Sequence, residues 1–168
     1  LGVIGFGRIG QATAKMALGL GMKVLAFDPF LEKTTLSLAF YDGQTVDFEI
    51  NTVSKETVLK ESDFITLHVP AQKEFVIDEA ELELMKDGAG LVNAARGGVV
   101  NEVALVKALD SNKLAFAGLD TFENEPTPAI QLLMNPKISL TPHIGAATNQ
   151  AQDRIGSELA SQIISILK

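Results

Sequence analysis

The chain has no cysteine and no tryptophan, and it has only two histidines among its 168 residues. Without cysteine it can form neither disulfides nor thiolate metal sites, which is typical of a reducing compartment, so we expect a cytoplasmic location. No apolar run is long enough to span a membrane. The net charge of −7 disfavours a broad nucleic-acid-binding surface. We therefore expect no metal, no nucleic acid and no membrane as a partner.

Apolar runs alternate with helical patterns along the chain, which indicates an α/β fold. Strands that alternate with helices pair in parallel through right-handed crossovers, and helices then cover both faces of the sheet. The pattern predicts a doubly wound, mostly parallel Rossmann sheet, with strands near 1–4, 23–28, 63–69, 90–94, 114–120 and 138–141. Helices are predicted before Gly21, over 55–61, before Gly88, over 102–110 and over about 149–167.

The first and last predicted helices each carry an apolar stripe at helical spacing. The first has Ile9, Ala12, Met16, Ala17 and Leu20, and the last has Ile155, Leu159, Ile163 and Ile166. Residues 36–50 break the α/β rhythm, because two runs of alternating apolar residues flank an Asp42-Gly43 turn. This arrangement is typical of a hairpin. We expect an antiparallel insertion at one edge of the sheet.

The stretch Gly5-Phe6-Gly7-Arg8-Ile9-Gly10 matches the G-x-G-x-x-G pattern. By itself such a stretch can be a glycine-rich turn. Here it follows a strand, opens a helix, and precedes an acidic residue, Asp28, at the end of the next strand, which is the context of dinucleotide binding. The helix N-terminus would bind the pyrophosphate. Asp28 would accept hydrogen bonds from the adenosine ribose and repel a 2′-phosphate, so the sequence favours NAD over NADP.

Three later strand ends carry polar side chains that one sheet edge would bring together. They are Arg96, then Asp120 with Glu123 and Glu125, and finally His143. Each also has a plainer interpretation: a surface arginine, a solvated acidic loop, and a histidine at a loop corner bonded to a backbone carbonyl. Together they suit the oxidation of a 2-hydroxy acid. Arginine would hold the carboxylate, histidine would take the hydroxyl proton, and a glutamate would orient the histidine.

The motifs GFGRIG, LHVP, NAARGGVVNE, DTFENEP and LTPHIGAAT stand in the same order as in a known family. Together they resemble the nucleotide-binding domain of D-isomer-specific 2-hydroxyacid dehydrogenases, and most of all the D-3-phosphoglycerate dehydrogenases. The resemblance implies that Arg96 binds the substrate carboxylate, that Glu125 pairs with His143, and that His143 is the acid/base. It further implies a cofactor site formed by Gly5, Gly7, Arg8, Ile9, Gly10, Asp28, His68, Pro70, Ala95, Asp120, Gly145 and Ala146.

The chain departs from the family in its extent. Family members have a second, discontinuous substrate domain, so we expect residues 1–168 to be an excised dinucleotide-binding domain, with a homodimer formed through it. Thr121 replaces an aliphatic residue of the family. The alternative from another class is an NADH-sensing binding module on the same fold, and a third interpretation is a Rossmann domain without a ligand. Neither the individual hydroxy acid nor any regulation follows from the sequence.

Overall fold

The computed structural model describes residues 1–167 and confirms the predicted α/β fold. A parallel sheet of six strands has the order β2-β1-β5-β6-β7-β8, so the strand order reverses between β1 and β5. In such sheets ligands bind outside the carboxyl ends of the strands near this reversal. The six strands are β1 (Gly2–Ile4), β2 (Leu25–Phe27), β5 (Phe64–Leu67), β6 (Ala89–Asn93), β7 (Leu114–Leu119) and β8 (Ile138–Leu140).

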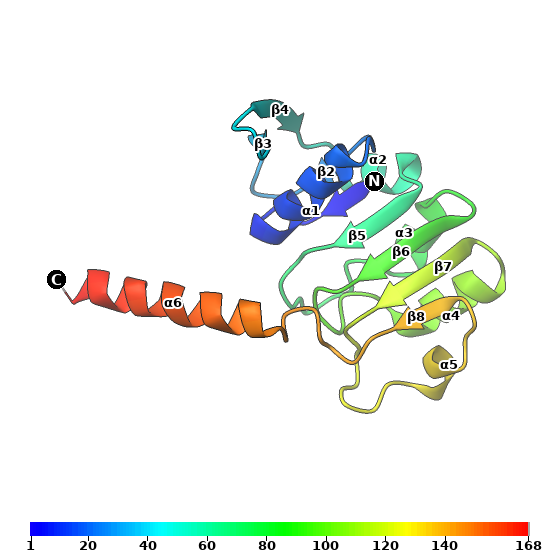
Figure 1. Ribbon diagram of the computed structural model, residues 1–168. Coiled ribbons are helices and arrows are strands. Elements are labelled where there is room, and N and C mark those ends of the chain that lie inside the picture. The colour runs from blue at the N-terminus through cyan, green and yellow to red at the C-terminus, as the bar shows by residue number, and fades with distance from the viewer. Residues whose placement is uncertain (168) are drawn as a thin grey trace.

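Helices lie on both faces of this sheet. On one face α3 (Glu79–Leu84) contacts both α2 (Lys55–Glu61) and α4 (Glu102–Asp110), and α1 (Arg8–Gly19) packs against β1. In Figure 1, α3 and α4 lie behind the sheet and α1 lies in front of it. The short helix α5 (Ile130–Leu133), which the sequence pattern did not predict, lies next to β8.

The helix boundaries follow local capping chemistry closely. The side chains of Ser54 and Asn101 accept hydrogen bonds from the third amide beyond them, and these caps start α2 and α4 at the predicted residues. Asp78 and Glu81 form a capping box at the start of α3. That helix ends at Leu84, before the Gly88 that was expected to stop it, because Met85 is already extended.

The apolar stripe predicted for α1 is buried only at Ala17. Ile9, Met16 and Leu20 are 70%, 64% and 81% exposed, whereas the buried residues of the helix are Gly10, Ala14 and Ala17. Small side chains let the helix lie close to the strands, and the large ones are turned away from the sheet. Residue size, rather than hydrophobicity, therefore decided which side of α1 is buried.

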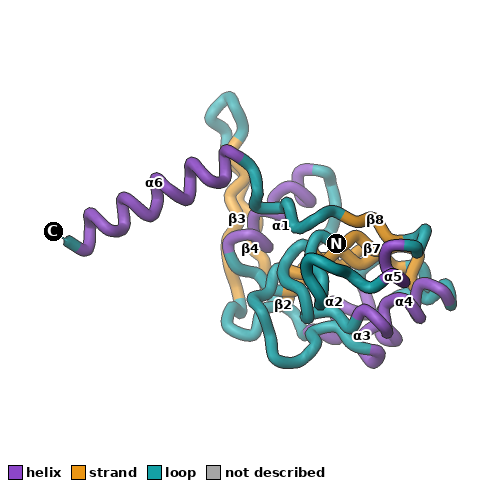
Figure 2. Tube along the Cα trace, turned by 90° about the horizontal axis from the view of Figure 1, so that it is seen from below, coloured by secondary structure: helices purple, strands orange, loops and turns teal. Residues whose placement is uncertain are grey.

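The last helix, α6 (Asn149–Ile166), extends from the body of the domain and has no buried residue. Figures 1 and 2 both show it projecting away from the sheet. The expected stripe of Ile155, Leu159, Ile163 and Ile166 is present but is 48% to 80% exposed. No helix within residues 1–167 is both long and apolar enough to cross a membrane.

The predicted hairpin forms, but it does not join the main sheet. Strands β3 (Lys33–Ala39) and β4 (Thr45–Asn51) pair antiparallel as a separate two-stranded sheet. The Gly43 backbone has a φ of 85°, which favours glycine, and the carboxylate of Asp42 accepts a hydrogen bond from the Gln44 amide. Leu36 is fully buried in a small cluster with Phe6 and Ala14, so the hairpin packs against the α1 side of the domain.

Candidate functional site

The glycine-rich turn has the geometry that an approaching pyrophosphate needs. A Cβ at Gly5, whose φ is 90°, would lie 2.4 Å from the His68 carbonyl oxygen, and one at Gly10 would lie 2.2 Å from the Gly5 carbonyl oxygen. A Cβ at Gly7 would meet nothing within 4 Å. Helix α1 begins at Arg8 without a side-chain cap or an acidic residue in its first turn. Its first amides therefore have no side-chain cap at the carboxyl end of β1, and amides of this kind suit a phosphate.

Asp28 follows β2 and lies against this turn. One of its carboxylate oxygens accepts a hydrogen bond from the Phe6 amide at 2.8 Å, and the other accepts from the Phe30 amide at 2.9 Å. Each carboxylate oxygen has a second lone pair, so these bonds leave acceptor capacity for a ribose hydroxyl. Arg8 and Ile9 are exposed beside it, and the Arg8 guanidinium lies 3.1 Å from the Glu158 carboxylate of α6.

His68 and Pro70 follow β5, the next strand at the reversal of strand order. The His68 ring is half-buried, with Nε2 3.1 Å from the Thr66 hydroxyl, and burial lowers the pKa of His68, which favours the neutral imidazole. Pro70 is exposed. The remaining predicted cofactor residues, Ala95, Gly145 and Ala146, follow β6 and β8 on the same edge of the sheet; Ala95 is buried and Ala146 is exposed.

Arg96 lies on the loop that follows β6, and its guanidinium donates a hydrogen bond to the Ala95 carbonyl at 2.6 Å. The buried Asn93 holds this loop, because its side chain donates to the Arg96 carbonyl and accepts from the Ala95 amide. The sequence interpretation did not single out Asn93. A polar residue at the end of an otherwise apolar strand was the available signal. Within residues 1–167, no hydrogen bond joins Arg96 to Glu125 or His143, so the structure does not bond Arg96 to either of these two residues.

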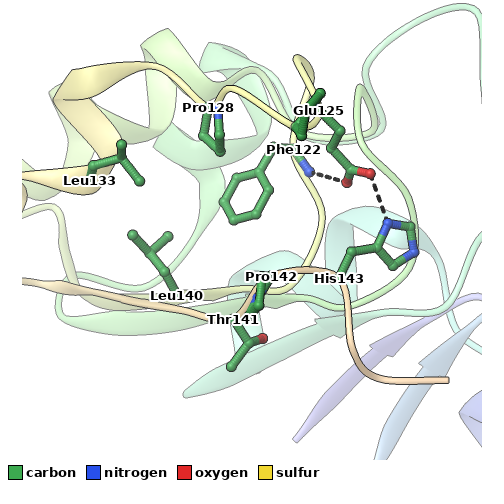
Figure 3. Close-up of a pocket in the computed structure, with 9 residues that line it drawn as sticks. Phe122, Glu125, Pro128, Leu133, Leu140, Thr141, Pro142 and His143 are labelled. Carbon is green, nitrogen blue, oxygen red and sulfur yellow. Dashed lines mark hydrogen bonds and ion pairs between the residues drawn. The ribbon is translucent and has the colours of Figure 1, made fainter. Parts of the chain in front are cut away.

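Glu125 and His143 are in contact, as the sequence predicts. Nδ1 of His143 lies 2.8 Å from one carboxylate oxygen of Glu125, and the other oxygen accepts a hydrogen bond from the Phe122 amide at 3.0 Å (Figure 3). The hydrogen bond from His143 lowers the pKa of Glu125, and the Phe122 amide adds to this shift. The carboxylate thus orients the ring, and Nε2 is left to exchange a proton with a ligand.

The backbone at His143 has a φ of 54°, which is uncommon for a residue other than glycine. Asp120 holds the loop around it, because one oxygen accepts from the Thr141 hydroxyl at 2.6 Å and the Ile144 amide at 2.9 Å, and the other accepts from the Gly145 amide at 2.9 Å. Burial raises the pKa of Asp120, but these hydrogen bonds outweigh burial and lower it overall. Asp120 thus fixes the conformation of the loop that presents His143.

A cavity of about 450 Å³ borders the Glu125–His143 pair. Its walls are mainly apolar, and Figure 3 shows the side chains of Phe122, Leu133 and Leu140 lining it beside the pair. Apolar walls next to an acid/base pair lower the local dielectric and strengthen electrostatic interactions there. The Glu125–His143 pair therefore lies beside a mainly apolar cavity, at the carboxyl edge of the same sheet whose first strand leads into the glycine-rich turn.

Comparison with known proteins agrees with this geometry. Residues 1–145 match the family described as D-isomer specific 2-hydroxyacid dehydrogenase, NAD binding domain. Hydroxypyruvate reductase of Thermotoga maritima is 44% identical over 172 aligned residues, which cover 99% of this chain and 52% of that protein. Glyoxylate reductase of Thermococcus litoralis is 45% identical, with coverage of 100% and 49%. D-3-phosphoglycerate dehydrogenase of Archaeoglobus fulgidus is 42% identical, with coverage of 99% and 31%.

Solved structures give the same assignment. D-2-hydroxyisocaproate dehydrogenase superposes with a TM-score of 0.83 at 33% identity, covering 99% of this chain and 52% of that one. The NAD complex of a D-isomer specific 2-hydroxyacid dehydrogenase from Lactobacillus delbrueckii ssp. bulgaricus gives 0.80 at 30% identity, with coverage of 99% and 52%. The chain thus spans about half the length of these relatives or less. It belongs to the D-isomer specific 2-hydroxyacid dehydrogenase family, and its matched residues are the NAD-binding domain of that family.

Proposed function

We propose that the whole protein is an NAD-dependent dehydrogenase that interconverts a D-2-hydroxy acid and its 2-oxo acid. The observation that carries this proposal is the Glu125–His143 pair, which lies at the edge of the sheet that also bears the open N-terminus of α1. A phosphate site alone would suit many nucleotide-binding proteins. A carboxylate-oriented imidazole on the same edge adds a group that can take a proton as a hydride leaves the substrate.

Each residue has a proposed role in this reaction. Bound NAD would supply the hydride acceptor. Arg96 would leave the Ala95 carbonyl and hold the substrate carboxylate through two hydrogen bonds. Nε2 of His143 would take the hydroxyl proton, and the Glu125 carboxylate would stabilise the imidazolium that results. In the reduction of a 2-oxo acid, His143 would return that proton to the carbonyl oxygen.

The proposed cofactor residues divide by the part of NAD that they would meet. Gly5, Gly7 and Gly10 with the amides of Arg8 and Ile9 would cradle the pyrophosphate. Residues Asp28, His68 and Pro70 would lie at the adenosine, and Ala95, Asp120, Gly145 and Ala146 at the nicotinamide. The charge of Asp28 favours NAD over NADP, because two unit charges about 4 Å apart near a protein surface repel by roughly 4 kcal/mol before solvent relaxes.

We also propose that residues 1–168 are one dinucleotide-binding domain, that the substrate domain lies elsewhere in the protein, and that the protein is a cytoplasmic homodimer. The exposed apolar side chains of α1 and α6, among them Met16, Leu20 and Leu159, support burial of these helices against another domain or subunit. The substrate belongs to the class of small 2-hydroxy and 2-oxo acids. By their names, relatives of similar identity act on hydroxypyruvate, glyoxylate or 3-phosphoglycerate.

The test is an assay of the full-length protein with NADH and a panel of 2-oxo acids that includes glyoxylate, hydroxypyruvate and 3-phosphohydroxypyruvate. We expect turnover of at least one of them, whereas a module that only senses NADH would bind it without turnover.

Calorimetry should show NADH binding more tightly than NADPH, and Asp28→Asn should narrow that difference in affinity. Equal affinities for the two cofactors in the unaltered protein would contradict the role of Asp28. Residues 1–168 alone should bind NADH and lack turnover, because water exclusion needs the substrate domain.

A further inference from the structure

Two acidic side chains outside the proposed reaction form a reciprocal pair of hydrogen bonds. The Glu123 amide donates to Oε1 of Glu102 at 2.7 Å, and the Glu102 amide donates to Oε1 of Glu123 at 2.9 Å. Glu102 is the first residue of α4 and is only 8% exposed. Each carboxylate thus binds the backbone of the other residue. We call this pair of hydrogen bonds the Glu102–Glu123 clasp.

The clasp lies where two functional loops touch. One loop follows β6, carries Arg96 and leads into α4, and the other follows β7 and carries Glu125. Between them the backbones are in direct contact, because a Cβ at Gly97 would lie 1.8 Å from the Phe122 carbonyl oxygen and 3.3 Å from the Glu123 amide nitrogen. Only one residue separates Glu123 from Glu125 in the sequence. The Glu125 carboxylate accepts a hydrogen bond from the Phe122 amide. The clasp therefore joins the arginine loop to the loop of the proton-transfer pair.

The burial of Glu102 works against the stability of this arrangement. Burial raises the pKa of Glu102, the nearby charge of Glu123 raises it further, and the hydrogen bond from the Glu123 amide lowers it. A buried carboxylate close to another one contributes little net stability compared with a well-packed apolar side chain. What the two carboxylates provide is a fixed register between two backbone segments, since each bond is directional and shorter than 3 Å.

We propose that Glu102 and Glu123 are positioning residues that fix the loop of Arg96 relative to the loop of Glu125, and thereby the separation between the carboxylate-binding group and the proton-transfer pair. This inference rests on the proposed function. In this proposal neither Glu102 nor Glu123 touches substrate or cofactor. Reactions of a bound substrate depend steeply on the alignment of the reacting groups, so a loosened register should slow turnover more than it weakens binding.

The experiment uses the full-length protein with the 2-oxo acid that gives turnover. Glu102→Ala and Glu123→Ala should each lower kcat by about tenfold. The KM for the 2-oxo acid should change by less than about threefold, and the Kd for NADH by less than about twofold. Because the two changes break one clasp, the double variant should lose less than the product of the two single losses. Glu102→Gln and Glu123→Gln keep an amide oxygen as the acceptor and should restore most of the kcat.

The matched control is Asn101→Ala, which removes the side-chain cap of the same helix, because Asn101 accepts a hydrogen bond from the Ala104 amide at 3.0 Å. It should lower the melting temperature and leave kcat within about twofold, since cap removal affects stability. If Asn101→Ala lowers kcat as much as Glu102→Ala does, the effect comes from the stability of α4 and the proposal fails. Alanine variants that keep their full kcat would overturn it as well.

A second readout does not depend on turnover. The Phe122 amide donates to Glu125, so its hydrogen exchange reports whether that carboxylate stays in place. Exchange at Phe122 should rise at least about tenfold in Glu102→Ala and Glu123→Ala and stay unchanged in Asn101→Ala. If the unaltered protein turns over no 2-oxo acid, the proposed function fails. Independently of that result, unchanged hydrogen exchange at Phe122 in the two alanine variants would overturn the positioning role of Glu102 and Glu123.

Discussion

The two ends of the site are built by opposite means. The glycine-rich end depends on side chains that are missing, because a Cβ at Gly5 or Gly10 would lie within 2.4 Å of a backbone oxygen. The end that holds His143 depends on side chains that are present, since the carboxylates of Asp120 and Glu125 accept hydrogen bonds from backbone amides around it. The glycine-rich turn therefore excludes added volume at Gly5 and Gly10, whereas the conformation of the His143 loop depends on carboxylate acceptors.

The largest expected effect comes from His143→Asn in the full-length protein. Asparagine accepts the left-handed backbone conformation that His143 has, with its φ of 54°, so the loop should persist. Loss of the proposed acid/base should lower kcat/KM by about 10²- to 10⁴-fold, while the Kd for NADH should stay within about twofold. Steady-state kinetics and calorimetry on the same variant check both parts. A large loss of NADH affinity would mean that His143 also contributes to cofactor binding, so that the two ends of the site do not act independently.

The next largest effect distinguishes the roles of two glycines in the turn, Gly10 in stability and Gly7 in NADH binding. Gly10→Ala would put a Cβ 2.2 Å from the Gly5 carbonyl oxygen and should destabilise the protein by roughly 2–3 kcal/mol. Gly7→Ala adds a Cβ that meets nothing within 4 Å, and the φ of Gly7 is −74°, so the free energy of unfolding should change by less than about 0.5 kcal/mol. It should nevertheless weaken NADH binding by about tenfold, or 1.4 kcal/mol.

Chemical denaturation and calorimetry distinguish these outcomes. Gly19→Ala serves as the control, because a Cβ there also meets nothing and Gly19 ends the helix at a distance from the turn. If Gly7→Ala binds NADH normally, the pyrophosphate does not approach Gly7 and the cradle is wrongly placed.

A smaller effect concerns Thr121, a buried polar residue on the loop that follows β7. The Thr121 side chain is 1% exposed, and its hydroxyl has no hydrogen-bond partner within the part of the chain that the structure describes. A buried hydroxyl without a partner costs about 1–3 kcal/mol. Thr121→Val should therefore stabilise the protein by about 1 kcal/mol, measured by urea denaturation. Thr13→Val is the control, since the Thr13 hydroxyl is bonded to the Ile9 carbonyl, and it should give no gain.

The sequence predicted the strands and most helices from short-range patterns, and the rule that parallel strands end at one edge placed a glutamate near His143. The family resemblance then singled out Glu125 rather than Glu123. The sequence predicted an apolar stripe on α1 and on α6 but not what covers it, and Met16 and Leu159 on these stripes are exposed. Which face a helix buries depends on what it packs against, and that is not a local property. The same reason hid the Glu102–Glu123 clasp, whose partners lie 21 residues apart. The sequence indicates Glu123 only as part of an acidic loop.

The smallest effect is a difference in acid sensitivity between the two ends. The folded protein lowers the pKa of Glu125 through the hydrogen bond from His143, and it lowers the pKa of Asp120 through hydrogen bonds that outweigh burial. A carboxyl whose folded pKa is lowered contributes stability above its unfolded pKa, and this stability is lost as pH falls through the folded value. Glu102 has a raised pKa, so its contribution has the opposite sign and fades as pH rises through its folded value.

On acidification from about pH 6 to about pH 3, the Phe122 and Gly145 amides should therefore lose protection against hydrogen exchange, because their acceptors are the carboxylates of Glu125 and Asp120. The Gly5 and His68 amides donate to the carbonyls of Phe27 and Ile4, which do not titrate, and should keep their protection longer. Exchange rates must first be corrected for their intrinsic dependence on pH. Glu125→Gln should remove the acid sensitivity at Phe122 but leave it at Gly145. A simultaneous loss of protection at all four amides would instead indicate one global acid unfolding, in which the carboxylates near His143 have no separate part.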